Sequence, residues 1–272
     1  MYRLVATDLD GTLFNQYSKI SGKTLQAVEG LKARGIAVAI ASGRTCAEIA
    51  ELIKPLGLET YPHGYIIGYN GVVALSTDPR ETLFRKMIHG EDVRRIARWA
   101  EPRGMKLHVF SEDRIYLSEG IELIINSDSE MMAAAPRIIA SEYAGSDEVY
   151  KVLIYEADER LNEFQRNLPE DLSSRYTVFK SAKHLLEFVR KDASKGHAVA
   201  EIASSLGIPP AEVMAFGDEE NDISMLEYAG MGVAMDNAQP AVKKAAKRIA
   251  MSNRLDGVAE MINREILEVE GK

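Results

Sequence analysis

Two aspartates separated by one residue, Asp8 and Asp10, follow a short apolar stretch near the start of the chain. Carboxylates this close repel one another unless a cation neutralises them, and oxygen ligands of this kind suit Mg²⁺. Gly11 follows directly and can form a turn that directs the two side chains differently. An ordinary Asp-Gly turn at the end of a strand would explain the same residues, so the pair alone leaves both interpretations open.

Two more polar clusters follow apolar runs later in the chain. Ser42-Gly43-Arg44 follows the run 36–41, and residues 217–222 follow another such run. The hydroxyl and backbone N–H groups of the first cluster could hold phosphate oxygens, although a serine there could also simply cap a helix. Asp218, with Asp222 behind it, could complete a metal site, although acidic residues are also common in a first helical turn.

Lys195 stands at the start of another predicted helix. A lysine in a first turn opposes the helix dipole, which favours anions at that end. A local misfit of this kind can indicate a functional role. The alternative is a solvated surface lysine.

The elements predicted around these clusters explain how the clusters would meet. Val/Ile/Ala-rich runs alternate with helices in the first and last parts of the chain, which is typical of a parallel sheet wound by right-handed crossovers. In such a sheet, ligands bind outside the carboxyl ends of the strands, so the clusters are expected on one edge. Strands are predicted over residues 3–7, 36–41, 213–216 and 232–234, and helices over 21–34, 45–56, 195–206, 221–228 and 241–247.

The pattern changes in the middle of the chain. Between about residues 84 and 189, strands with one polar face, such as 106–110, accompany the helices, which is typical of a sheet with one wet face. We therefore predict an α/β fold with a Rossmann-like parallel-sheet core wound by helices, formed by residues 1–83 and 190–272. An α+β domain of residues 84–189 is inserted into it.

The bulk composition narrows the function classes. The chain has 272 residues, of which 46% are hydrophobic, and a net charge of -8. This charge opposes binding to nucleic acid or to an anionic membrane. The first residues do not form a signal peptide, and no apolar run approaches the roughly 18 residues that a membrane span needs. We expect a cytoplasmic protein without nucleic acid or membrane partners; the composition does not indicate an oligomeric state.

Taken in order, these motifs resemble those of the Cof-type haloacid dehalogenase-like superfamily, whose members carry a C2-type cap between the second and third motifs. The resemblance covers essentially the whole chain. The motifs are Asp8-Leu9-Asp10-Gly11-Thr12-Leu13; Ala41-Ser42-Gly43-Arg44; Ser194-Lys195-Gly196; and Gly217-Asp218-Glu219-Glu220-Asn221-Asp222, followed by Met225-Leu226 and the stretch 232–238.

The resemblance implies a Mg²⁺-dependent phosphohydrolase with two catalytic aspartates. Asp8 would attack phosphorus and form an aspartyl-phosphate, and Asp10 would protonate the leaving oxygen and later activate water. The Mg²⁺ ligands would be the Asp8 carboxylate, the Asp10 carbonyl and Asp218, with Asp222 in support.

The resemblance also implies which residues would contact the phosphorylated substrate. Ser42, Gly43, Lys195 and Asn221 would hold the phosphoryl oxygens, and Arg44 and Asn70 would lie near the substrate. The expected partners are small phosphorylated metabolites, sugar phosphates foremost, selected by the cap.

Two other functions remain alternatives. A phosphomutase would pass the phosphoryl group of the aspartyl-phosphate to a second hydroxyl instead of to water, and the cap type favours hydrolysis. A phospho-ligand sensor without turnover would not need the acid/base carboxylate, whereas both Asp8 and Asp10 are present.

Overall fold

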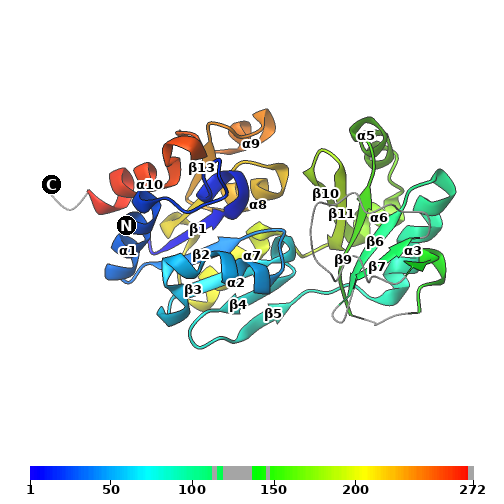
Figure 1. The fold of residues 1–272 in the computed structure, drawn as a ribbon, viewed down its shortest axis with the longest axis horizontal. Helices are drawn as coiled ribbons and strands as arrows, with labels where there is room; N and C mark the ends of the chain where they lie inside the picture. Colours follow the sequence, from blue (N-terminus) through cyan, green and yellow to red (C-terminus); the bar gives the residue numbers. More distant parts are fainter. Residues whose placement is uncertain (112–114, 119–136, 145–147, 269–272) are drawn as a thin grey trace. The chain divides into compact units, whose positions relative to one another are not determined.

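The computed structural model describes residues 1–111, 115–118, 137–144 and 148–268, and divides into two compact units. The first comprises Met1–Arg85 and Ala193–Lys272, and the second comprises Lys86–Asp192. The chain enters the second unit once and returns once, as the sequence colours in Figure 1 show.

The first unit is built on an eight-stranded sheet with the order β14-β13-β12-β1-β2-β3-β4-β5. All neighbours from β14 to β3 are parallel, as predicted, whereas β3–β4 and β4–β5 are antiparallel. The strands are β1 (Leu4–Asp8), β2 (Ala37–Ala41), β3 (Gly64–Gly68), β4 (Val73–Ser76), β5 (Thr82–Arg85), β12 (Val213–Gly217), β13 (Met231–Met235) and β14 (Arg248–Ala250).

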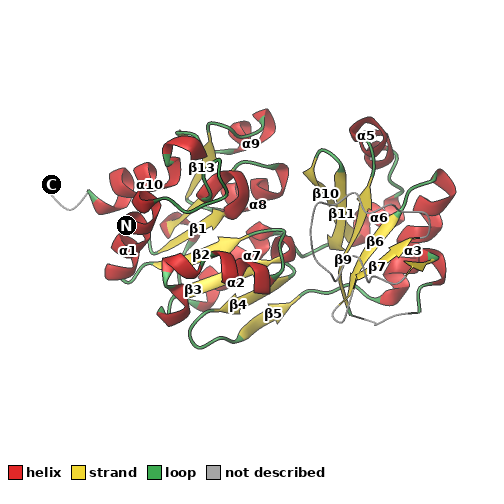
Figure 2. Cartoon of the chain, viewed as in Figure 1, coloured by secondary structure: helices red, strands yellow, loops and turns green. Residues whose placement is uncertain are grey.

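Helices cover both faces of this sheet (Figure 2). The chain moves from β1 to β2 in one direction along the sheet and from β12 to β13 in the other. Because both connections are expected to be right-handed, their helices lie on opposite faces. One layer contains α1 packed on α10, and the other contains α7 packed on α8. The helices are α1 (Gly22–Ala33), α2 (Cys46–Leu52), α7 (Lys195–Ser205), α8 (Ile223–Tyr228), α9 (Pro240–Ala245) and α10 (Gly257–Ile262).

Helix α2 is shorter than the predicted helix over residues 45–56. It ends at Leu52, and a 3-10 turn over Lys54–Leu56 follows. Pro55 explains the difference, because proline lacks the N–H that an α-helix needs and its ring collides with the preceding turn.

The register of the central strands positions the polar clusters. All five residues of β1 and of β2 are buried, as expected for strands covered on both faces. Asp8 is level with Ala41 in the β1–β2 pair, and Thr7 is level with Phe216 in the β1–β12 pair. The residues that follow these strands therefore leave the sheet at the same carboxyl edge.

The second unit is α+β, as predicted. Its six-stranded sheet has the order β10-β11-β9-β6-β7-β8 and is antiparallel except for the β7–β8 pair. Its core joins apolar residues of the helices to those of the strands. The elements are α3 (Gly90–Ala100), β6 (Leu107–Ser111), β7 (Ile115–Ser118), β8 (Arg137–Ile138), β9 (Val149–Tyr155), α5 (Asp158–Arg166), α6 (Glu170–Arg175), β10 (Tyr176–Ala182) and β11 (Leu185–Arg190).

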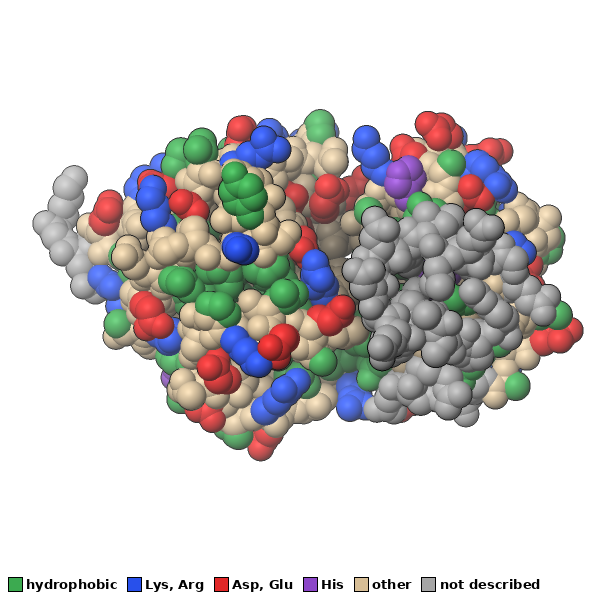
Figure 3. Space-filling view, viewed as in Figure 1, with side chains coloured by type: hydrophobic (Ala, Val, Ile, Leu, Met, Phe, Trp, Pro, Cys, Tyr) green, Lys and Arg blue, Asp and Glu red, His purple; other side chains and the backbone are tan. Residues whose placement is uncertain are grey.

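The surface of the first unit carries charges of both signs. Acidic and basic side chains are interspersed on its face drawn in Figure 3. Within the described ranges, none of the helices is both long enough and apolar enough to cross a membrane.

Candidate active site

Three buried carboxylates meet at the carboxyl edge of the central strands. Asp8 ends β1, Asp218 directly follows β12, and Asp222 comes four residues later. One oxygen of each lies within 4.8 Å of the others. Like charges at such distances repel strongly in a buried environment, so the cluster needs cations close by.

Lys195 supplies one of these cations. Its Nζ donates to Oδ1 of Asp8 and to Oδ1 of Asp222, at 2.6 Å each, and the residue is 1% exposed. This contact explains why a lysine stands in the first turn of α7. A single ammonium group against three carboxylates leaves two formal negative charges, which suits a divalent cation held by oxygen ligands.

The pKa values follow from this burial. Burial raises the pKa of Asp8 well above its ordinary value; Lys195 opposes the shift, while Asp222 and Asp218 reinforce it. Burial likewise raises the pKa of Asp218 to about 7, against the effect of its hydrogen bond from Thr12. Burial acts to lower the pKa of Lys195, but the two carboxylates outweigh it and raise that pKa. Among the described residues, Lys195 therefore does not fully offset the burial and mutual repulsion of Asp8 and Asp218.

The turn after Asp8 brings the chain against Asp218. Gly11 has φ +85°, and a Cβ at this position would collide with the Asp218 carboxylate. The next residue, Thr12, donates its hydroxyl to Oδ1 of Asp218 at 2.7 Å. Glycine and threonine are thus needed here for close approach and for orientation of Asp218.

Asn237 connects the same turn to the segment that contains Asn253. Its amide donates to the carbonyl of Gly11 at 2.9 Å and accepts from the N–H of Asn253 at 3.0 Å. Sequence reasoning assigned no role to Asn237 or to Thr12. The signal for Asn237 was its position shortly after a predicted strand, where the rule for parallel sheets places ligand-binding residues.

Asp10 points to a different partner from Asp8. Arg44 donates from Nε and Nη2 to the two Asp10 oxygens at 2.7 and 2.8 Å, a bidentate ion pair whose side chains are 40% and 45% exposed. The hydrogen bond from Arg44 to Asp10 raises the pKa of the guanidinium. The Asp10 carboxylate is therefore half-exposed and lies outside the cluster of three carboxylates.

Ser42 is not the cap of helix α2. Thr45 caps it, because the Thr45 hydroxyl accepts from the Glu48 N–H and the Glu48 carboxylate accepts from the Thr45 N–H. Ser42 is 3% exposed, and its hydroxyl accepts from the N–H of Arg44 at 3.3 Å. A loop ahead of the helix, and not the helix terminus, presents the Ser42 hydroxyl.

Asn221 approaches this loop through Asn70. The Asn221 Nδ2 donates to Oδ1 of Asn70 at 2.8 Å, and Asn70 is 1% exposed. The Asn221 Oδ1 is buried and has no hydrogen-bond partner among the described residues. The structure thus brings the predicted metal and phosphate residues to one edge, whereas Asn70 is covered by protein.

Asp222 depends on a glycine at the end of β12. Its Oδ2 accepts from the N–H groups of Asp218 and Glu219 at 2.9 and 3.0 Å, and a Cβ on Gly217 would collide with the Asp222 side chain. We expect Gly217→Ala to displace Asp222, to lower activity by at least about tenfold and to lower Tm by several degrees, through about 1–3 kcal/mol of overpacking. Phosphate release and thermal unfolding measure both.

Gly22→Ala is the matched control. Gly22 opens α1, and a Cβ there would meet nothing within 4 Å, so alanine should be neutral or slightly stabilising. Wild-type activity in Gly217→Ala would show that Asp222 does not need its observed position.

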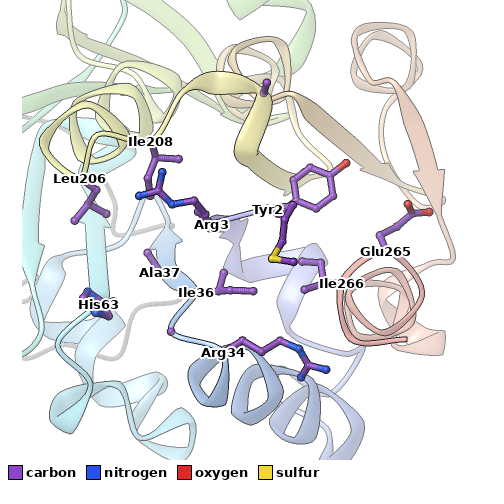
Figure 4. Close-up of a pocket in the computed structure, with 13 residues that line it drawn as sticks. Tyr2, Arg3, Arg34, Ile36, Ala37, His63, Leu206, Ile208, Glu265 and Ile266 are labelled. Atoms are coloured by element: carbon purple, nitrogen blue, oxygen red, sulfur yellow. The ribbon is translucent and has the colours of Figure 1, made fainter. Parts of the chain in front are cut away.

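A separate cavity lies at the opposite, amino edge of the sheet. Figure 4 shows it between residues that precede or begin strands, such as Arg3, Ile36 and Ala37, and residues that follow α7, such as Ile208. None of the predicted catalytic, metal or phosphate residues lines it. The chemistry predicted from the sequence therefore belongs to the carboxyl edge.

The first unit thus combines a parallel α/β core with Asp8 at the end of its first strand and with the buried Lys195, Asp218 and Asp222 at the same edge. Residues 5–262 match the family described as haloacid dehalogenase-like hydrolase. A putative phosphatase of Streptococcus pyogenes serotype M6 is 30% identical over 266 residues, which cover 97% of this chain and 98% of that protein. The chain belongs to the haloacid dehalogenase-like hydrolase family, and it is a phosphatase.

Two more proteins resemble the chain over nearly their full lengths. The crystal structure of a haloacid dehalogenase-like hydrolase from Bacteroides thetaiotaomicron superposes with a TM-score of 0.79 at 30% identity, covering 98% of this chain and 100% of that one. The 5-amino-6-(5-phospho-D-ribitylamino)uracil phosphatase YitU of Bacillus subtilis is 29% identical over 265 residues, covering 95% of this chain and 96% of YitU. Hydrolases of this family normally use a divalent metal, and the three clustered carboxylates could hold one.

Proposed function

We propose that this phosphatase is Mg²⁺-dependent and that it hydrolyses small phosphorylated metabolites, foremost sugar phosphates, through an aspartyl-phosphate on Asp8. The observation that carries the proposal is the position of Asp8 at the end of β1, held by Lys195 among two further buried carboxylates. Lys195 binds Oδ1 of Asp8, which leaves Oδ2 as the nucleophilic oxygen.

The donor set fits a hard divalent cation. Asp8 and Asp218 would hold Mg²⁺ together with the carbonyl of Asp10. Asp222 would support the site, because its oxygens are occupied by Lys195 and by two backbone N–H groups. When bound, Mg²⁺ neutralises charge on the transferring phosphoryl group.

The reaction proceeds in two steps that share one acid/base group. Oδ2 of Asp8 forms a bond to phosphorus while the bond from phosphorus to the ester oxygen breaks, and Asp10 gives its proton to that oxygen. Water then attacks phosphorus, loses its proton to Asp10, and the bond to Asp8 breaks with release of phosphate. Asp10 is half-exposed and both of its oxygens accept from Arg44 in this structure, so it has to leave this ion pair and hold a proton before it acts as the acid.

The phosphoryl oxygens would be held by three separate parts of the chain. The Ser42 hydroxyl, the Lys195 ammonium and the Asn221 amide are donors near the same sheet edge, and the Gly43 N–H lies in the same loop as Ser42. One cationic donor and several neutral donors together favour binding of the phosphorylated substrate over binding of the alcohol that hydrolysis releases.

The substrate class is inferred from a relative. YitU is named for a substrate whose phosphate is carried by a ribityl chain. A phosphorylated polyol or sugar is therefore the class that we propose for this chain, with the inserted unit, Lys86–Asp192, as the part that selects among such molecules.

Removal of the metal tests the proposal directly. With Mg²⁺ we expect release of phosphate from p-nitrophenyl phosphate and from sugar phosphates, and we expect loss of at least about a hundredfold in rate after chelation, restored by added Mg²⁺. Mg²⁺ at one hundred times its Kd should stabilise the folded protein by about 2.7 kcal/mol, and Tm should therefore rise.

Asp218→Asn distinguishes stabilisation by Mg²⁺ bound at the site from a general effect of ionic strength on Tm. This variant removes one expected ligand, so Mg²⁺ should raise its Tm much less than that of the wild type, while NaCl should affect both proteins equally. Full activity after exhaustive chelation and dialysis would refute Mg²⁺ dependence.

A further inference from the structure

We infer that Asn70 is a positioning residue that sets the direction of the Asn221 amide and holds the three phosphate-binding segments together. The resemblance implies that Asn70 lies near the substrate; the residue is 1% exposed and its side chain accepts from Asn221, so it contacts a phosphate-binding residue. The inference rests on the proposed function, because it concerns how that site holds a phosphoryl group.

The loop after β3 has an unusual backbone. Tyr69, Asn70 and Gly71 have φ values of +50°, +59° and +100°, so three consecutive residues are left-handed and two of them are not glycine. Residues with side chains adopt this conformation only at an energetic cost, and such strain persists where the surrounding contacts impose it. The loop is therefore held by its neighbours.

The main chain of the loop is bonded to the segment that carries Ser42. The Tyr69 N–H donates to the carbonyl of Arg44, and the Asn70 N–H donates to the carbonyl of Ser42, both at 2.9 Å. These bonds fix the loop of Ser42 on either side of Gly43. The Asn70 amide also lies so close to Gly43 that a Cβ there would stand 3.1 Å from Nδ2 of Asn70.

The Asn70 side chain determines which end of the Asn221 amide is the donor. Because Oδ1 of Asn70 accepts from Nδ2 of Asn221 at 2.8 Å, the NH₂ group of Asn221 lies on the side of the phosphate-binding loop. One of its two hydrogens is used by Asn70, and we expect the other to donate to a phosphoryl oxygen. A reversed amide would present a carbonyl oxygen, which repels an anion.

Gly71 extends the same loop to the start of α7. A Cβ on Gly71 would collide with the carbonyl of Ser194 and approach the nitrogen of Lys195 closely. Three consecutive residues, 69–71, thus contact segments that carry Ser42, Lys195 and Asn221, which lie far apart in the sequence. Asn70 is 1% exposed, so it acts on the substrate through these residues.

Asn70→Gly removes the side chain and remains compatible with the left-handed backbone at this position. Glycine favours the left-handed conformation, so the variant should fold, and Tm by thermal unfolding checks this. We expect kcat/KM for p-nitrophenyl phosphate to fall by about 10–100-fold, as for other residues that orient a site. The inhibition constant of orthovanadate, which mimics the transferring phosphoryl group, should rise by a similar factor.

A double-mutant cycle with Asn221→Ala identifies the route of the effect. If Asn70 acts through Asn221, adding Asn70→Gly to Asn221→Ala should cost little more than Asn221→Ala alone. Asn70→Asp retains an oxygen that can accept from Nδ2 of Asn221, so it leaves this contact in place. The change in kcat/KM that Asn70→Asp causes should therefore be nearly the same in the wild type and in Asn221→Ala. This second variant also tests the inference if Asn70→Gly folds poorly.

Ser18→Gly is the control for the backbone change. Ser18 is also left-handed, with φ +54°, and is exposed, so this variant should retain wild-type kcat/KM. The inference is overturned if folded Asn70→Gly keeps kcat/KM and vanadate inhibition within about twofold of wild type, or if its effect adds fully to that of Asn221→Ala. If Asp8→Asn is inactive and either of these two outcomes is found, the role of Asn70 is rejected while the proposed function is retained.

Discussion

Asp8→Asn is expected to lower the turnover of p-nitrophenyl phosphate by at least about a thousandfold while the protein stays folded. An amide nitrogen or oxygen at this position cannot form the aspartyl-phosphate, whereas its shape matches that of the carboxylate. The remaining oxygen can still accept from Nζ of Lys195, as Oδ1 of Asp8 does.

The stability of Asp8→Asn carries separate information. Burial raises the pKa of Asp8, which means that the fold disfavours its charged form. Replacement by a neutral side chain removes that cost, so we expect a Tm equal to or slightly above that of the wild type without Mg²⁺. Loss of activity with retained stability would mark Asp8 as a residue kept for chemistry.

Phosphate release and thermal unfolding, measured on protein free of contaminating phosphatase, check both parts. Asp256→Asn serves as the control, because Asp256 is a left-handed residue in the same unit, φ +58°, where asparagine is equally suitable. An active Asp8→Asn protein would exclude the aspartyl-phosphate mechanism.

Lys195→Met is expected to reduce both stability and activity. Removal of the ammonium leaves the buried carboxylates of Asp8 and Asp222 without their shared donor. Loss of one partner from a buried ionic cluster costs about 3–5 kcal/mol, which corresponds to a fall in Tm of roughly 5–15 °C. Activity should fall by at least about a hundredfold, because a donor to the phosphoryl group is lost as well.

Lys54→Met is the matched control for burial. Lys54 pairs with Glu51 at 2.7 Å, close to the 2.6 Å of the Lys195 pairs, but both side chains are largely exposed. Exposed pairs contribute little, so this variant should unfold within a degree or two of the wild type. Equal Tm values for the two lysine variants would contradict the view that burial makes Lys195 structurally essential.

Much of the core fold could be predicted from local patterns. The strands around Val5, Val38 and Met214 are buried on both faces, and such strands appear in a sequence as short continuous apolar runs. By contrast, β3, β4, β5 and β14 were not predicted. Of these, β4 and β5 are antiparallel to their neighbours, and β5 is largely exposed, so the alternation of buried strands and helices does not extend to them.

The expected site residues were identified from their positions after strands and from the resemblance, but their partners were not. The pairing of Asp10 with Arg44 and the burial of Asn70 against Asn221 were both absent from the sequence-based expectations. Helix α2 also started as predicted but ended early, because Pro55 limits it locally.

The sequence by itself determined the class of fold, the order of the motifs and the types of side chain at the carboxyl edge, because hydrophobic periodicity and turn residues act over a few neighbouring positions. Only the tertiary structure decided that Lys195 would lie between Asp8 and Asp222. Those contacts join residues 187 and 27 positions apart. Local preferences carry no information about such distances, and strand register together with the exclusion of water selects the partners.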